Sequence, residues 1–196
     1  MKGSALKAYF DTALRSSRLI LNNLERASDL VQNFKQVAVD QTHLDKRTFA
    51  LKKYIEDSLV NLTPYLKRTS HKITVKGDDT LSIQSYPGAF SQIIANLVMN
   101  SVNHAYQKSE AGLIQFDLRR ELSGQLILVY SDDGCGISAD TLGKIFEPFF
   151  TTNRAKGGTG LGLHIVYNLV TQKLKGTICV ESQVGVGTTF IIELPL

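Results

Sequence analysis

Residues 126–137 read Leu-Ile-Leu-Val-Tyr-Ser-Asp-Asp-Gly-Cys-Gly-Ile, an apolar run that changes abruptly into acidic residues and glycines. The apolar run predicts a buried strand, with Asp132 directly after it. Two interpretations of the polar end stay open. It is a plain turn, since Asp and Gly are common in turns. Alternatively, it holds a carboxylate at a strand end, where Gly134 and Gly136 let a flat ligand approach the backbone.

The helix expected over residues 91–105 has an unusual polar face. At about 100° per residue, four polar side chains fall within a sector of about 100°: Asn96, Asn100, Asn103 and His104. Asparagine is a poor helix former, so three of them on one face are unusual for a surface that is merely solvated. Amide oxygens are hard, neutral ligands suited to Mg²⁺, which also takes substrate phosphates and water. A solvated face and a metal site both remain open on this pattern alone.

The glycine-rich stretch Gly157-Gly158-Thr159-Gly160-Leu161-Gly162 opens a helix expected over residues 161–174. Glycines before a helix expose unpaired N–H groups, which bind phosphate. The stretch is not a dinucleotide fingerprint, because no strand precedes it, and it is not a P-loop, because no Gly-Lys-Ser/Thr follows. Upstream, an apolar patch at residues 145–152 leads into a basic segment, which predicts a lid hinged by glycines.

The remaining pattern mixes strands and helices. Strands are expected near residues 49–51, 73–75, 81–83, 114–118, 126–129, 177–181 and 188–194, and helices over 52–66, 87–107 and 161–174. The strands near 73–75 and 81–83 flank a turn at residues 77–79, and Gly185-Val186-Gly187 predicts a hairpin. Because the order lacks a strict β-α-β rhythm, the pattern predicts a layered α/β sandwich.

Residues 1–43 differ in kind from the rest of the chain. Up to Asp40 there is no proline and one glycine, Gly3. From Leu6 through Phe10 to Ala38, apolar or small residues recur at alternating gaps of four and three, the seam of a coiled coil or helical bundle. A lone helix cannot bury such a stripe, so it is expected to pack on another helix. The second domain is expected to span residues 44–196.

Composition excludes several classes of protein. Hydrophobic residues make up 43% and charged residues 20%, as in soluble globular proteins. The net charge of +4 is small and scattered, which argues against nucleic-acid binding. No segment reaches the roughly 18 to 20 apolar residues of a membrane span. Cys135 and Cys179 are too few for a disulfide framework or zinc site, which favours reduced thiols in the cytoplasm.

In this order and spacing, the motifs resemble the N box, the two glycine boxes, the F box and the final Gly-x-Gly-Thr of sensor histidine kinase ATP-binding domains. That superfamily includes gyrase, heat-shock chaperone and mismatch-repair ATPases. The resemblance covers about residues 45–196, and the preceding helix resembles the second helix of the dimerisation and phosphotransfer hairpin. It implies a Bergerat-type fold: a two-layer α/β sandwich with helices on one face of a mixed sheet, after a long N-terminal helix.

The resemblance also implies ligands and residue roles. Asn100 would coordinate the Mg²⁺ of Mg-ATP, Asn96 would support the metal or its waters, and Asp132 would accept a hydrogen bond from the adenine amine. Asn103 stands where the family commonly has a basic residue, and His104 or Lys156 would replace that phosphate contact. The other implied nucleotide-binding residues are Gly134, Gly136, Ile137, Gly158, Thr159, Gly160, Leu161, Gly162 and Thr188.

The implied function is transfer of the γ-phosphoryl of ATP to a histidine on the hairpin, for relay to a response regulator in two-component signalling. Asn96 stands where hydrolytic relatives carry a Glu base, and an amide cannot take a proton from water. None of the four histidines, His43, His71, His104 and His164, is followed by an acidic residue. The chain is therefore expected to be a cytoplasmic fragment that homodimerises through its N-terminal helix, with acceptor, sensor and membrane segments upstream.

Two other functions stay open. An ATPase or Ser/Thr kinase of the same superfamily would turn ATP over alone or label serine or threonine. A nucleotide-dependent dimerisation module that is not an enzyme would bind Mg-ATP without transfer to any supplied acceptor.

Overall fold

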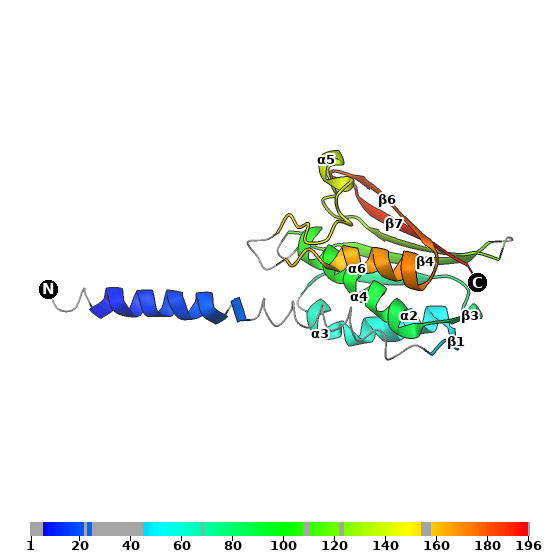
Figure 1. The fold of residues 1–196 in the computed structure, drawn as a ribbon, viewed down its shortest axis with the longest axis horizontal. Coiled ribbons are helices and arrows are strands. Elements are labelled where there is room, and N and C mark those ends of the chain that lie inside the picture. The colour runs from blue at the N-terminus through cyan, green and yellow to red at the C-terminus, as the bar shows by residue number, and fades with distance from the viewer. Residues whose placement is uncertain are drawn as a thin grey trace.

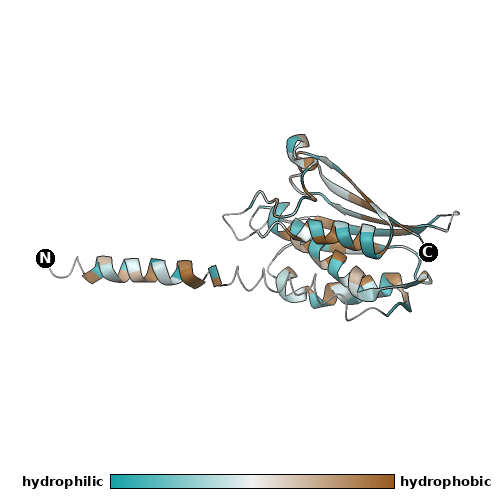
Figure 2. Cartoon of the chain, viewed as in Figure 1, coloured by the Kyte–Doolittle hydropathy of each residue, from teal (hydrophilic) through white to brown (hydrophobic). Residues whose placement is uncertain are grey.

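The computed structural model describes residues 6–21, 23–24, 45–67, 69–107, 110–121, 124–153 and 158–195. Residues 6–21 and 23–24 are helical, as the stripe predicts, and the remainder of the expected helix, to Ala38, lies outside the described residues. Hydrophobic residues recur along this helix (Figure 2), and Leu6, Phe10 and Leu14 are each more than half exposed. No helix in the described ranges is both long and apolar enough to cross a membrane.

From residue 45 onward the chain forms an α/β domain (Figure 1). Its elements are β1 (Arg47–Ala50), α2 (Leu51–Asn61), α3 (Thr63–Leu66), β2 (Lys72–Lys76), β3 (Ser82–Ser85), α4 (Pro87–His104), β4 (Leu113–Arg120), β5 (Leu126–Asp132), α5 (Ala139–Leu142), α6 (Gly162–Asn168), the π-helix η2 (Leu169–Lys173), β6 (Thr177–Gln183) and β7 (Gly187–Leu194).

The main sheet has five strands in the order β2-β4-β5-β7-β6. β2 and β4 are parallel and the other neighbours antiparallel, so the sheet is mixed. α2, α4 and α6 lie on one side of this sheet (Figure 1). Along β5, buried and half-buried residues alternate from Leu126 to Asp132, because successive strand side chains point to opposite faces. The expected two-layer sandwich with a long N-terminal helix is confirmed.

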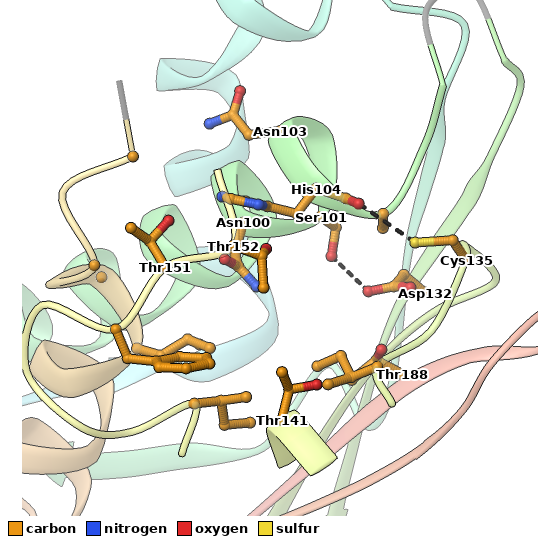
Figure 3. A pocket seen from close by; sticks show the side chains of 18 of the residues that line it. Asn100, Ser101, Asn103, His104, Asp132, Cys135, Thr141, Thr151, Thr152 and Thr188 are labelled. Atoms are coloured by element: carbon orange, nitrogen blue, oxygen red, sulfur yellow. Dashed lines mark hydrogen bonds between the residues drawn. The ribbon is translucent and has the colours of Figure 1, made fainter. Parts of the chain in front are cut away.

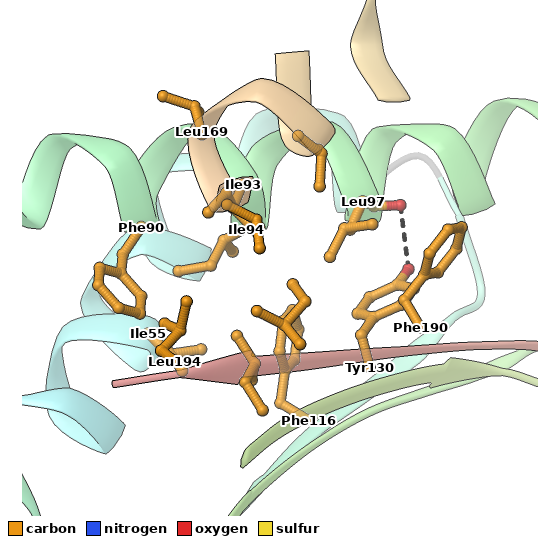
Figure 4. Close-up of a cluster of buried hydrophobic side chains, with 14 of the residues drawn as sticks. Ile55, Phe90, Ile93, Ile94, Leu97, Phe116, Tyr130, Leu169, Phe190 and Leu194 are labelled. Carbon is orange, nitrogen blue, oxygen red and sulfur yellow. Dashed lines mark hydrogen bonds between the residues drawn. The ribbon is translucent and has the colours of Figure 1, made fainter. Parts of the chain in front are cut away.

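The core lies between α4 and the sheet (Figure 4). Phe90, Ile94 and Leu97 of α4 are fully buried, as are Phe116 of β4 and Tyr130 of β5. The Phe116 and Tyr130 rings meet edge to face with centroids 5.0 Å apart, a favoured aromatic geometry. α4 begins at a proline that follows an extended residue, which suits the first helical turn. This packing holds the polar face of α4 in place relative to the end of β5.

Several details go beyond the sequence predictions or differ from them. The strands that flank the turn at residues 77–79 do not pair with each other, since β2 pairs with β4 and β3 pairs with β1. The single helix expected over residues 52–66 is two helices, because Pro64 cannot donate a helical hydrogen bond and stands in the first turn of α3. The expected helix over residues 161–174 changes into a π-helix after Asn168, and the four-residue helix α5 was not predicted.

Candidate functional site

A cavity of about 680 Å³ lies where the polar face of α4, the end of β5 and the start of α6 meet (Figure 3). Twelve residues predicted from the sequence line it: Asn96, Asn100, Asn103, His104, Asp132, Gly136, Ile137, Gly158, Thr159, Gly160, Gly162 and Thr188. Gly134 and Leu161 lie outside this lining, and Lys156 lies outside the described residues. Motifs far apart in sequence thus surround one space.

Asp132 is the buried carboxylate of the cavity, only 8% exposed. Its Oδ2 accepts a hydrogen bond from Ser101 Oγ at 2.6 Å, and its Oδ1 accepts one from the Gly134 backbone N–H at 3.1 Å. Burial raises the pKa of Asp132, while the bonds from Ser101 and from the Gly134 and Thr188 backbones oppose that rise. The cavity therefore presents an oriented hydrogen-bond acceptor.

The neighbouring Asp133 has a different role. Its Oδ1 accepts hydrogen bonds from the Leu113 backbone N–H at 2.7 Å and from the Tyr106 hydroxyl at 3.0 Å. These bonds attach the loop after β5 to the start of β4. Of the two adjacent aspartates, Asp132 lines the cavity and Asp133 holds the loop in place.

The glycines after Asp132 allow the loop to pack closely against the neighbouring backbone. A side chain at Gly134 would collide with Ala105 at the end of α4, and the next residue, Cys135, donates its N–H to the Ala105 carbonyl at 2.7 Å. Gly136 has φ +71, and a Cβ there would meet the Gln183 carbonyl oxygen. The loop is thereby held between α4 and the β6–β7 hairpin. Gly136 lines the cavity as predicted. Gly134 lies outside the lining and donates its backbone N–H to the Asp132 carboxylate.

Ser182 of β6 connects this loop to Thr188, a partner that the motifs did not reveal. Its Oγ accepts the Ile137 N–H at 2.8 Å, donates to the Gly187 carbonyl at 2.8 Å and lies 3.0 Å from Thr188 Oγ1. Thr188 is 5% exposed and faces Asp132 across the β5–β7 register. The hairpin predicted at residues 185–187 is confirmed, and it places Thr188 beside the carboxylate.

The polar face of α4 supplies the amides of the cavity. Asn96 and Asn100 both line it and are partly buried. The Asn96 Nδ2 atom is buried without a hydrogen-bond partner in the described structure, so it can donate to an acceptor brought in by a ligand or water. Among the described residues, no group of three His, Cys, Asp or Glu side chains could hold a metal. Mg²⁺ that takes phosphate oxygens and water needs only one or two protein ligands, so these amides fit it.

The described ends of the expected lid border the same cavity. Gly160 has φ +68, and a Cβ there would collide with the Phe149 backbone. The Asn153 amide donates to the Asn103 carbonyl at 3.4 Å, and the Gly158 N–H donates to the Asn153 carbonyl at 3.2 Å. Residues 154–157, between these ends, lie outside the described residues.

His164 of α6 connects this helix to the apolar segment at residues 145–152. Its Nδ1 lies 3.0 Å from the Phe146 carbonyl oxygen and its Nε2 lies 3.0 Å from the Asn168 amide nitrogen. A carbonyl accepts and an amide nitrogen donates, so Nδ1 carries the proton and Nε2 accepts. Both ring nitrogens are engaged, which suits a structural histidine and not a phosphate acceptor.

The lining also contains residues to which the sequence patterns assigned no role in ligand binding. They are Met99, Ser101, Ala105, Cys135, Ser138, Thr141, Ile145, Phe150, Thr151, Thr152, Leu163 and Val184. Most are apolar or small hydroxyl residues with no distinctive spacing. Ser101 carried one local signal, a polar residue on the apolar side of a helix.

Comparison with known proteins identifies the family to which this chain belongs. The family described as "Histidine kinase-, DNA gyrase B-, and HSP90-like ATPase" matches residues 86–196. The chain belongs to this family. Among its relatives, the sensor histidine kinase ZraS of Escherichia coli K12 is 34% identical over 92% of the chain, and the sensor kinase CckA of Brucella abortus is 35% identical over 93%.

Solved structures of this family share the fold. The catalytic domain of histidine kinase ThkA superposes with a TM-score of 0.65 at 25% identity, covering 77% of this chain and 95% of that domain. The chain spans 37% of the length of ZraS and 22% of that of CckA. It therefore contains the ATP-binding catalytic domain of a two-component sensor kinase, and matches only part of each full-length relative.

Proposed function

We propose that this chain binds Mg-ATP in the cavity and positions the γ-phosphoryl for transfer to a histidine, for relay to a response regulator. The observation that carries the proposal is the convergence on one cavity of a buried acceptor, Asp132, and two amides, Asn96 and Asn100. In this proposal residues 44–196 form the catalytic domain and residues 1–43 belong to a dimerisation unit in the cytoplasm.

The adenine end is assigned to Asp132. Its carboxylate accepts the exocyclic amine, with Gly136, Ile137 and Thr188 around the base. Guanine carries a carbonyl oxygen at the corresponding position, which a carboxylate repels. An acceptor left facing an acceptor costs about 1 to 3 kcal/mol, so ATP is preferred over GTP.

The phosphate end is assigned to α4 and the glycine loop. Asn100 holds Mg²⁺ and Asn96 supports it, while Asn103, His104 and the Gly158–Gly162 segment surround the phosphates. The ion, when bound, neutralises phosphate charge. Lys156 remains a proposed phosphate contact from the part of the lid outside the described residues.

The side chains around the phosphate end favour phosphoryl transfer over hydrolysis of ATP. Among the described residues, Asp132 is the one carboxylate that lines the cavity, and it belongs to the adenine end. The position that would hold a base for water carries the amide of Asn96, which cannot take a proton. The site is suited to holding ATP until another nucleophile is presented.

Replacing Asn100 is the test of the metal assignment. Asn100→Ala is expected to remove the Mg²⁺-dependent tightening of ATP binding, a loss of at least about tenfold, because a ligand to the ion is lost. Titration of a fluorescent ATP analogue with and without Mg²⁺ measures this. Asn61→Ala, at the exposed end of α2, is the matched control and should keep the full metal effect. An unchanged metal effect in Asn100→Ala contradicts the assignment.

The N-terminal helix is expected to mediate self-association. Leu6, Phe10, Leu14, Leu21 and Leu24 are all more than half exposed, an apolar stripe that water disfavours. Analytical ultracentrifugation of the chain should show dimers or larger species. Removing residues 1–40 should leave a monomer that still binds ATP. A clean monomer of the intact chain at high concentration would mean that the helix folds back on its own catalytic domain.

A further inference from the structure

A buried chain of hydroxyl groups ends on the Asp132 carboxylate. The Tyr130 hydroxyl lies 2.6 Å from Ser101 Oγ, which in turn lies 2.6 Å from Asp132 Oδ2 (Figure 3 shows the second bond). Tyr130 is 0% exposed, Ser101 is 2% exposed and Asp132 is 8% exposed. Because this network is shielded from water, its hydrogen bonds are strong, and the loss of one partner affects the others.

The direction of the bonds follows from the groups themselves. Burial raises the pKa of Tyr130 well above its usual value, so this phenol keeps its proton and donates it. The Asp132 carboxylate can only accept. Ser101 therefore donates its single proton to Asp132 and accepts from Tyr130. The same Tyr130 hydroxyl also lies 3.1 Å from the Leu97 carbonyl oxygen (Figure 4), a second acceptor for its proton.

Ser101 also decides how the carboxylate is turned. The terminal torsion of an aspartate is broad, so the side chain alone does not set the plane of its two oxygens. In this site Ser101 holds Oδ2 from the α4 side and the Gly134 N–H holds Oδ1 from the loop. With both oxygens held, the plane is set, and the lone pairs not used by these donors are available to the cavity.

We propose that Ser101 is a positioning residue for base recognition: its hydroxyl orients the Asp132 carboxylate so that it accepts the exocyclic amine of adenine. This inference rests on the proposed function, since it assumes that ATP occupies the cavity. Ser101 stands beside Asn100 in sequence, but it acts through Asp132 and does not itself contact the base.

The experiment compares the binding of two nucleotides to the unaltered chain and to three variants. Purine riboside triphosphate lacks the 6-amino group and is otherwise like ATP. Ser101→Ala should weaken ATP binding about tenfold and purine riboside triphosphate binding less than about twofold, since only ATP uses the oriented acceptor. Tyr130 keeps the Leu97 carbonyl as acceptor in this variant, so no buried hydroxyl is left unpaired.

Ser58→Ala is the matched control. Ser58 is also buried in a helix, at 8% exposed, and its hydroxyl donates to the Tyr54 carbonyl at 2.8 Å, in α2, outside the cavity lining. It should leave both affinities unchanged. Thermal unfolding of each variant checks that the fold survives. Ser101→Thr, which keeps the hydroxyl, should restore most of the discrimination between the two nucleotides.

Three results would overturn the inference, each in a different way. If Ser101→Ala weakens both nucleotides equally, or neither, Ser101 has no link to the amine although ATP binding stands. If the unaltered chain binds ATP no better than purine riboside triphosphate, the Asp132–amine contact itself fails. If the unaltered chain binds neither nucleotide, the proposed function fails as well.

Discussion

After incubation with Mg²⁺ and radiolabelled ATP, the chain is expected to bind nucleotide and to carry no acid-labile phosphate. Transfer needs a nucleophile held in line at about 3 to 3.5 Å from the phosphorus. None of the four histidines has an acidic neighbour that could act as base. His164 has both ring nitrogens engaged by Phe146 and Asn168, which removes it as an acceptor.

Supplying an acceptor should change the result completely. A separate hairpin that carries a histidine followed by an acidic residue should become labelled, and Asn100→Ala should abolish that labelling. Acid-labile phosphate that maps to His43, His71, His104 or His164 would contradict the expectation. Steady release of free phosphate would instead favour an ATPase. Binding without transfer to any supplied hairpin would favour a regulatory module.

The second large effect is expected at Asp132. Asp132→Asn should weaken ATP binding about 10- to 100-fold and remove most of the preference for ATP over GTP, because an amide can donate to the guanine carbonyl. Competition of ATP and GTP against a fluorescent analogue measures both quantities. Asp57→Asn, at an exposed position of α2, is the matched control.

The pH dependence of the same competition gives an independent check. Burial raises the pKa of Asp132, so lowering the pH protonates this carboxyl earlier than an exposed one. A protonated carboxyl donates a hydrogen bond, which guanine accepts and the adenine amine does not. The preference for ATP should therefore shrink as the pH falls. Equal affinity for ATP and GTP at neutral pH would contradict the role of Asp132.

Much of the secondary structure could be predicted from local sequence patterns. The apolar run before Asp132 predicted β5, the proline and the helical period predicted α4, and the glycine pair at residues 185 and 187 predicted the β6–β7 hairpin. These elements are local features, since backbone sterics and side-chain period act over a few residues. Asn96 and Asn100 stood out because asparagine is unusual on a helix face. Asp132 fitted an ordinary turn equally well, and the roles of all three residues came from the resemblance to histidine kinase ATP-binding domains.

Only the tertiary structure decided which strands pair. Residues 72–76 and 82–85 each alternate as a strand should, yet β2 pairs with β4 and β3 pairs with β1. Alternation tells which side chains share a face and says nothing about the neighbouring strand. The same holds for Ser182, which reaches Thr188 and Ile137 only because β6 and β7 pair in their observed register.

Ser101 shows most clearly what sequence periodicity cannot predict. On α4 it falls on the apolar side with Leu97 and Ile94, so helical periodicity assigns it to the core, and it is indeed buried. The periodicity of α4 does not predict that β5 ends beside this helix, with Asp132 as the last residue of the strand. The sequence by itself determined that residue 101 is inside; the packing of α4 on β5 decided that its hydroxyl meets a carboxylate there, because that contact depends on two elements brought together by the whole core.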